Sequence, residues 1–269
     1  MGKQQILDIN GKKAKEITTS VFDGQIRKDI VQKIAEVEKL DDKQLYAPFL
    51  WSGMQTSASG NVKHNRHVWK TDRGKGLSRY PKKRMSDKGE RFVWVAAAIP
   101  GVRGGRRAHP PHLLRKDLKI NKKEKALGLK SALAMVASDE NIQDKYSRLE
   151  GGKISIKLPI IVESKMLSLK TKEFLESLRR ILGDQLMSIA IQKRETRPGK
   201  GKMRGRKYKS NAGLLLVIAN NQAKKINGID VVNVKGLKIG DLASNGARLV
   251  MFTEESIKDL ETKITGGKK

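Results

Sequence analysis

The sequence contains no cysteine, and aromatic residues make up only 4% of its 269 residues. Without thiols, the chain can form no disulfide, no thiolate nucleophile and no sulfur-ligated metal centre. No apolar run approaches the roughly 18 residues that a transmembrane helix needs. The first ten residues, MGKQQILDIN, also lack the apolar stretch of a secretory signal peptide. We therefore expect an intracellular protein that works outside the membrane.

Acidic residues are also scarce: 28 Asp and Glu stand against 57 Lys and Arg, which gives a formal net charge of +29. Such an excess of one sign makes the free chain repel itself unless a polyanion neutralises it. Only 38% of the residues are hydrophobic and the mean hydropathy is −0.54, low for a chain that is folded throughout. The composition favours nucleic acid as the partner.

The positive charge is concentrated in two segments. Residues 46–112 hold 14 basic and three acidic residues, a net charge of +11, together with all the tryptophans and histidines; residues 192–209 hold nine basic residues and one acidic residue. Neither segment shows a 3.6-residue apolar stripe or a sustained alternation. Long structureless connections are uncommon inside compact domains unless they serve a function. We interpret 46–112 as an extended basic RNA-binding loop inserted in a globular domain of 1–45 and 113–269, and 192–209 as a second such loop.

Outside these loops, predicted strands alternate with predicted helices. The apolar run LLLVIA at 214–219 is typical of a strand buried on both faces. Asn121 is expected to cap a helix, with Glu124 completing its capping box. Further strands are predicted at 5–9, 158–162, 187–191, 229–234 and 248–252, and helices at 26–40, 122–136, 171–182 and from 253 onward. This order indicates an α/β fold: a mostly parallel sheet with helices on both faces, plus a long extended internal loop.

The motifs of nucleotide and metal sites are incomplete. The glycine-rich strings GVRGGRR and GKGKMRGRK lack the spacing of a dinucleotide or phosphate loop. His64 with His67, and His109 with His112, could supply four imidazole ligands to zinc. Neighbouring cations disfavour a divalent ion there, and no nearby carboxylate would orient the rings. With no nucleophile beside a base, we expect no cofactor, no metal and no enzymatic activity.

The basic segments have the chemistry of RNA binding. Lysine and arginine neutralise phosphates and release counterions, and arginine also stacks on bases. Trp69, Tyr80 and Trp94 are interleaved with these cations and could stack on unpaired bases, which favours RNA over duplex DNA. A disordered, solvated tail would explain the charge, but such tails are poor in aromatic residues.

Four strings carry a resemblance to a known family: GMQTSAS (53–59), GVRGGRRAHPP (101–111), NKKEKALGLKSALA (121–134) and RPGKGKMRGRKY (197–208). Together they resemble the large-subunit ribosomal protein L four family of archaea and eukaryotes over nearly the whole chain. The resemblance implies a cytoplasmic structural constituent of the ribosome that binds ribosomal RNA, aids its folding and assembly, and lines part of the peptide exit tunnel through its loop. It implies large-subunit ribosomal RNA, neighbouring ribosomal proteins and the nascent peptide as partners, with neither a membrane nor a homo-oligomer.

The resemblance, with the charge pattern, also selects candidate RNA-binding residues. They are Arg66, His67, Trp69, Lys70, Arg73, Lys75, Arg79, Lys82, Lys83, Arg84, Arg103, Arg106, Arg107, His109, Arg197, Lys200, Lys202, Arg204, Arg206 and Lys207. The middle of the loop, residues 61–93, departs from the family's pattern. We expect the tunnel-facing residues at 66–79.

Two other functions remain open from the residues. An RNA-modifying enzyme of the methyltransferase type would need a glycine-rich turn after a strand and an acidic ribose-binding residue, and neither is found. A DNA-compacting protein would prefer duplex DNA to structured RNA at matched salt. The aromatic residues in the basic segments favour the ribosomal interpretation.

Overall fold

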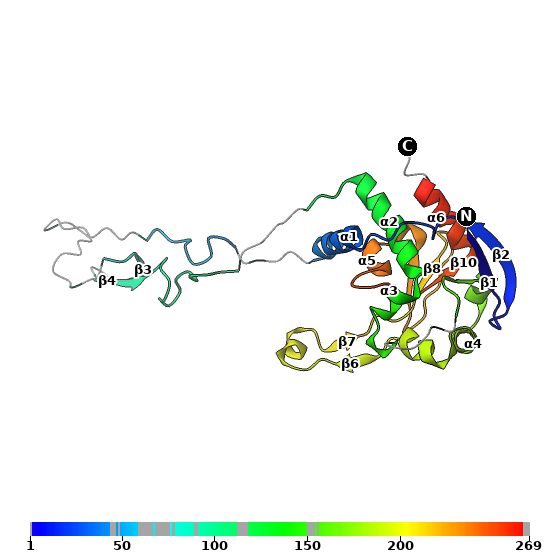
Figure 1. The fold of residues 1–269 in the computed structure, drawn as a ribbon. Coiled ribbons are helices and arrows are strands. Elements are labelled where there is room, and N and C mark those ends of the chain that lie inside the picture. The colour runs from blue at the N-terminus through cyan, green and yellow to red at the C-terminus, as the bar shows by residue number, and fades with distance from the viewer. Residues whose placement is uncertain are drawn as a thin grey trace. The chain divides into compact units, whose positions relative to one another are not determined.

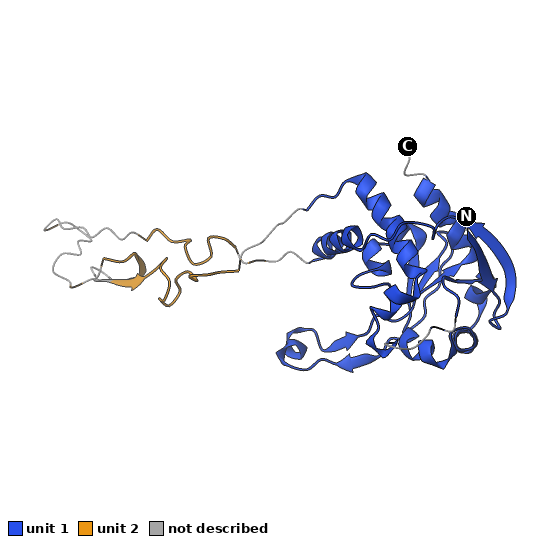
Figure 2. Cartoon of the chain, in the orientation of Figure 1, with its two compact units in different colours: residues 1–43, 118–269 blue, residues 44–117 orange. Residues whose placement is uncertain are grey.

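A computed structural model describes residues 2–43, 47, 49–58, 67, 76, 79–88, 91–111, 118–149, 154 and 156–265. The chain forms two compact units: residues 1–43 and 118–269 make up unit 1, and residues 44–117 make up unit 2 (Figure 2). The strands are β1 (Gly2–Leu7), β2 (Lys13–Thr19), β3 (Lys82–Lys88), β4 (Arg91–Ala96), β5 (Ile160–Val162), β6 (Arg194–Thr196), β7 (Tyr208–Ser210), β8 (Leu215–Ile218), β9 (Asp230–Asn233) and β10 (Val250–Thr253). The α-helices are α1 (Lys28–Asp41), α2 (Lys122–Val136), α3 (Asp139–Gln143), α4 (Thr171–Ala190), α5 (Ile239–Leu242) and α6 (Glu254–Thr265).

Unit 1 is built on a six-stranded sheet with the order β2-β1-β5-β10-β8-β9 (Figure 1). The first two strands form an antiparallel pair, and β1, β5, β10, β8 and β9 then follow one another in parallel. Helices lie in the connections from β1 to β5, from β5 to β8 and from β9 to β10, whereas residues 219–229 join β8 to its parallel neighbour β9 without a helix. The α/β fold class with a mostly parallel sheet is confirmed.

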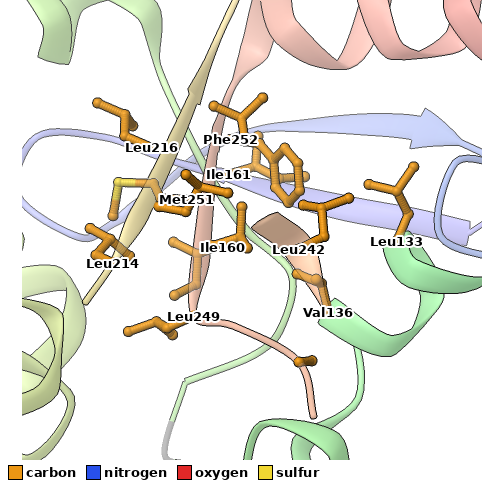
Figure 3. Packing of buried hydrophobic residues seen from close by; sticks show 14 of the residues in the cluster. Leu133, Val136, Ile160, Ile161, Leu214, Leu216, Leu242, Leu249, Met251 and Phe252 are labelled. Atoms are coloured by element: carbon orange, nitrogen blue, oxygen red, sulfur yellow. The ribbon is translucent and has the colours of Figure 1, made fainter. Parts of the chain in front are cut away.

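The centre of the sheet is buried on both faces. Successive side chains of a strand point to opposite faces, and all four residues of β8 and of β10 are buried. In β10, Phe252 lies on the side of the sheet where Val136 of α2 and Leu242 of α5 pack, whereas Met251 points to the opposite side (Figure 3). The continuous apolar runs in the sequence therefore reflect strands covered from both sides.

Helices α1, α2 and α5 pack against one another, and α2 begins as the sequence predicts. The Asn121 Oδ1 atom accepts a hydrogen bond from Lys123 N at 3.2 Å and caps the helix. The capping-box partner was wrong: the Glu124 carboxylate accepts from Lys33 Nζ of α1 at 2.6 Å instead. The glutamate thus joins two helices, because the neighbouring lysine offers it a charged donor.

Residues 187–191 do not form the strand that their apolar sequence suggested. The backbone of Gly183 (φ 68°, ψ 171°) is not helical and separates α4 into two helical parts, so the first part ends at this glycine as predicted, and a second helical part follows it to Ala190. Leu186 and Ile189 are buried at helical spacing beyond the kink. A short apolar run cannot distinguish a buried strand from a buried helical turn, and here packing of the second half of α4 decides for the helix.

Both basic segments, expected to lack regular structure, contain hairpins. In unit 2, β3 pairs with β4 in an antiparallel ribbon, and in unit 1, β6 pairs with β7. The β6–β7 hairpin is hard to predict from the sequence because every side chain of its two strands is exposed. Without a buried face, a strand needs no apolar alternation.

Candidate nucleic-acid interface

The β6–β7 hairpin projects from the body of unit 1 (Figure 1). Its strands pair from Arg194↔Ser210 to Thr196↔Tyr208, and a hydrogen bond from Arg197 N to Lys207 O at 2.8 Å extends the pairing. A 3-10 turn, η3 (Lys200–Arg204), forms its tip. Gly199 and Gly205 flank this turn with φ values of 79° and 76°, which non-glycine residues rarely adopt. The glycines of the GKGKMRGRK string therefore shape a tight turn.

The tip of the hairpin brings six of the predicted RNA-binding residues together. Arg197 is partly buried, whereas the other five are exposed: Lys200, Lys202, Arg204, Arg206 and Lys207. Met203, between two of them, is 80% exposed. A two-stranded ribbon with so little burial is marginally stable by itself in water. The turn therefore offers cations to solvent and gains little from burial.

The strands of the hairpin carry contacts that sequence reasoning missed. The Arg194 guanidinium lies over the Tyr208 ring, 3.7 Å from its centroid, in a cation–π contact. Glu195, the one acidic residue of 192–209, pairs with Lys209 at 3.5 Å. Because that pair lies on the strands, the carboxylate leaves the cations of the tip available to an outside anion. The short strings RET and YKS have no apolar alternation that would have indicated this pairing.

Hydrogen bonds fix the base of the hairpin to α4 and to β9 with the residues just before it. The Asn211 side chain accepts from Lys193 N at 2.7 Å and donates to Ile189 O at 3.4 Å. Gln192 donates from its backbone to Gly228 O at 2.9 Å and from its side chain to Asp230 Oδ2 at 2.8 Å. The exposed turn is therefore held on a frame that the buried sheet determines.

A cavity of about 340 Å³ lies at this base. Four basic residues and one acidic residue contribute to its lining: Lys145, Arg148, Lys193, Lys209 and Glu195. Burial, together with the positive charges of Arg248 and Lys39, lowers the pKa of Lys145 to about 8. Its ammonium group donates to Ser244 O at 3.0 Å. An anion in this basic cavity would raise the pKa of Lys145 again, because a nearby negative charge favours the charged ammonium.

Unit 2 contains the second set of predicted residues. Lys82, Lys83 and Arg84 lie on β3, where Arg84 pairs with Trp94 of β4 in the strand register and the Lys82 ammonium lies 5.2 Å from the centre of the Tyr80 ring. Four more predicted residues follow β4 in a looped segment and are exposed or partly buried: Arg103, Arg106, Arg107 and His109. The hairpin and this segment bring cations and aromatic rings within one unit.

The other predicted residues belong neither to the β3–β4 hairpin nor to the segment after it. His67 (φ 57°) and Arg79 are exposed. The remaining candidates lie outside the described residues: Arg66, Trp69, Lys70, Arg73 and Lys75. Within the described ranges, no three His, Asp or Glu side chains are grouped as metal ligands would be, and no helix has the length and apolarity to span a membrane.

Comparison with known proteins places the chain in a family. Residues 15–263 match the model of the Ribosomal protein L4/L1 family. Three archaeal relatives, each named large ribosomal subunit protein uL4, come from Methanospirillum hungatei (32% identity), Thermoplasma acidophilum (32%) and Archaeoglobus fulgidus (33%). Each alignment covers 96% of this chain and 97–98% of the relative. The chain belongs to the ribosomal protein L4/L1 family, and the resemblance carried by its four strings is confirmed.

Proposed function

We propose that this chain is a structural constituent of the large ribosomal subunit and that it binds ribosomal RNA through its two basic segments. Family membership supports the ribosomal role, since the relatives are named as large-subunit proteins. The class is structural, so no reaction is assigned to the chain. Its partners would be large-subunit ribosomal RNA and neighbouring ribosomal proteins, within the ribosomes of the cytoplasm.

The observation that carries the RNA-binding proposal is the β6–β7 hairpin. Its five exposed tip cations belong to a turn that buries almost nothing, while its single carboxylate is paired on the strands. Repulsion among these cations opposes the hairpin in free solution. Ribosomal RNA would neutralise them and release counterions, which is the main source of affinity in such interfaces.

Residues 46–112 are proposed as the second RNA-binding segment and as the part that lines the peptide exit tunnel. Under this proposal, residues 1–45 and 113–269 form the globular domain, and residues 66–79 face the nascent peptide. The cations of β3 and of the segment after β4 would contact phosphates of the ribosomal RNA. Photo-crosslinkers placed one at a time within 66–79 should capture the nascent chain of a stalled ribosome. Crosslinks to RNA alone at every position would refute the tunnel assignment.

Retention on the ribosome tests the main proposal. Large subunits carrying the full chain would be washed in rising salt and sedimented, and the chain should remain bound after a high-salt wash. Replacing Lys200, Lys202 and Lys207 by Gln should release it at lower salt, because three phosphate contacts are lost.

A matched control removes the same charge elsewhere in unit 1. Lys12, Lys15 and Lys172 are exposed and lie outside the hairpin. Their replacement by Gln should leave retention unchanged. Release of the wild-type chain at moderate salt, or equal behaviour of the two triple variants, would contradict the proposal.

A further inference from the structure

Unit 2 contains an open cavity with an apolar wall that lies outside the set of candidate RNA-binding residues. Its volume is about 580 Å³, and one wall is formed by residues 49–54 and the other by residues 105–111. Three consecutive apolar side chains on the first wall are largely in solvent: Phe49 is 61% exposed, Leu50 65% and Trp51 58%. Large apolar groups clustered on a surface mark a binding site for something outside the chain.

The two walls are held together by close packing of glycine backbones. Gly53 has φ 78°, and a Cβ atom at this position would lie 2.5 Å from Gly105 O. Turn hydrogen bonds from Ser52 N to Phe49 O and from Met54 N to Trp51 O, both 2.9 Å, shape the first wall. The cavity is therefore built by the backbone: two segments about fifty residues apart meet where glycine alone permits the approach.

The second wall is cationic. Arg106 and Arg107 line the cavity beside Pro110 and Pro111, so guanidinium groups face the same space as the aromatic and aliphatic side chains. A partly exposed apolar platform beside two arginines matches a ligand that has a flat apolar face and a negative charge next to it. An apolar segment of a neighbouring protein would match the first wall and leave the arginines without a counter-charge.

We propose that this cavity binds one unpaired base of ribosomal RNA. The base would pack against Trp51 or Phe49, and Arg106 and Arg107 would contact the flanking phosphates. The volume lies within the range of about 300–1,000 Å³ of sites for small ligands, which admits a nucleoside and excludes a duplex. Base faces are available only where a base is unpaired. The inference rests on the proposed function and assigns one contact to an unpaired base within it.

The test uses the full chain and two RNAs that differ by one nucleotide: a hairpin with a single bulged adenosine, and the same hairpin without the bulge. Fluorescence anisotropy at one salt concentration gives both affinities. The wild-type chain should prefer the bulged RNA about tenfold, as one base–aromatic stack provides. Trp51→Ala should reduce the ratio to about one while binding to the paired hairpin is unchanged.

Two variants and a crosslink make the result specific to the cavity. Trp51→Phe should retain most of the preference, because it keeps an aromatic face. Met85→Ala removes another exposed apolar side chain of unit 2, outside the cavity, and should retain the preference in full. A 4-thiouridine in place of the bulged base should crosslink to peptides covering 49–54 or 105–111.

The outcomes separate this inference from the proposed function. Equal binding of the two RNAs by the wild-type chain would overturn the cavity assignment and leave RNA binding by the basic segments intact. A preference that survives Trp51→Ala, with crosslinks outside both walls, would overturn it as well. Binding of neither RNA would count against the proposed function itself.

Discussion

The sheet of unit 1 and the β6–β7 hairpin attached to it are stabilised in opposite ways. Every residue of β8 is buried, whereas every residue of β6 and β7 is exposed. Burial of apolar side chains is the dominant favourable contribution to folding, so the sheet needs no partner. The hairpin has backbone pairing, a cation–π contact and a fixed base, and its eight cations repel one another. The comparison indicates that the sheet supplies a rigid support and the hairpin supplies the charge.

The largest expected change in the free energy of unfolding comes from a substitution in the buried sheet. Phe252 is fully buried on β10 and meets Phe22 edge to face, with ring centroids 5.4 Å apart. Phe252→Ala should lower the free energy of unfolding by about 3–5 kcal/mol, measured by urea denaturation, because it leaves a cavity in the core. Met203→Ala at the hairpin tip should change it by less than about 0.5 kcal/mol. Similar losses in both variants would mean that the hairpin contributes to stability as the core does.

An intermediate effect concerns a buried carboxylate. Glu38 of α1 is only 8% exposed and accepts hydrogen bonds from Gly240 N at 2.7 Å and Ile239 N at 3.3 Å, at the start of α5. Glu38→Ala should lower the free energy of unfolding by about 1–3 kcal/mol, since it leaves two backbone donors without their acceptor. Glu36→Ala, on the exposed side of the same helix, is the control. Equal values for the two variants would show that this tie between α1 and α5 is not stabilising.

The smallest effect concerns Lys145, where the body meets the hairpin. Its pKa is about 8 in the folded chain, against an ordinary value of 10.5. Between these values the unfolded chain holds a proton that the folded chain has lost, so stability should rise with pH. The rise should be below about 1 kcal/mol per pH unit and is best measured from pH 8 to about pH 9.5, because ordinary tyrosines ionise near pH 10.

Two variants test whether Lys145 causes this rise in stability with pH. Lys145→Met should abolish most of the increase between pH 8 and about pH 9.5 in urea denaturation. Lys193 lines the same cavity. The Lys193→Met variant should keep the increase in stability with pH, because Lys145 is retained. A rise that is unchanged in Lys145→Met would show that another group is responsible.

The fold was largely predictable because burial leaves a pattern in the sequence. The run at 214–219 is apolar throughout and became β8, and Asn121 caps α2 as expected. The error at 187–191 has a physical cause: Gly183 kinks α4, and the following apolar residues pack as a helix. Whether a strand or a second helical part follows such a glycine depends on tertiary packing, which local sequence does not contain.

The candidate site was only partly predictable, because exposed structure leaves a weaker pattern. Clustered Lys and Arg identified the tip of the β6–β7 hairpin, but the Arg194–Tyr208 contact depends on strand register. The cavity of unit 2 escaped prediction for a related reason. Phe49 to Trp51 are too few to show a period, and their partner wall lies about fifty residues later. The glycines at 53 and 105 were the available signal in the sequence. Their role follows only from the close approach of the two backbones in the structure.

The salt dependence of RNA binding tests the central claim most directly: the exposed hairpin is a phosphate-binding element on a body that folds independently. The slope of log K against log salt should become shallower by about 2–3 when Lys200, Lys202 and Lys207 are replaced by Gln, at about 0.7–0.9 per lost phosphate contact. The free energy of unfolding should not change. The control variant of Lys12, Lys15 and Lys172 should keep the wild-type slope. An identical slope in the hairpin variant and the wild-type chain would contradict the claim.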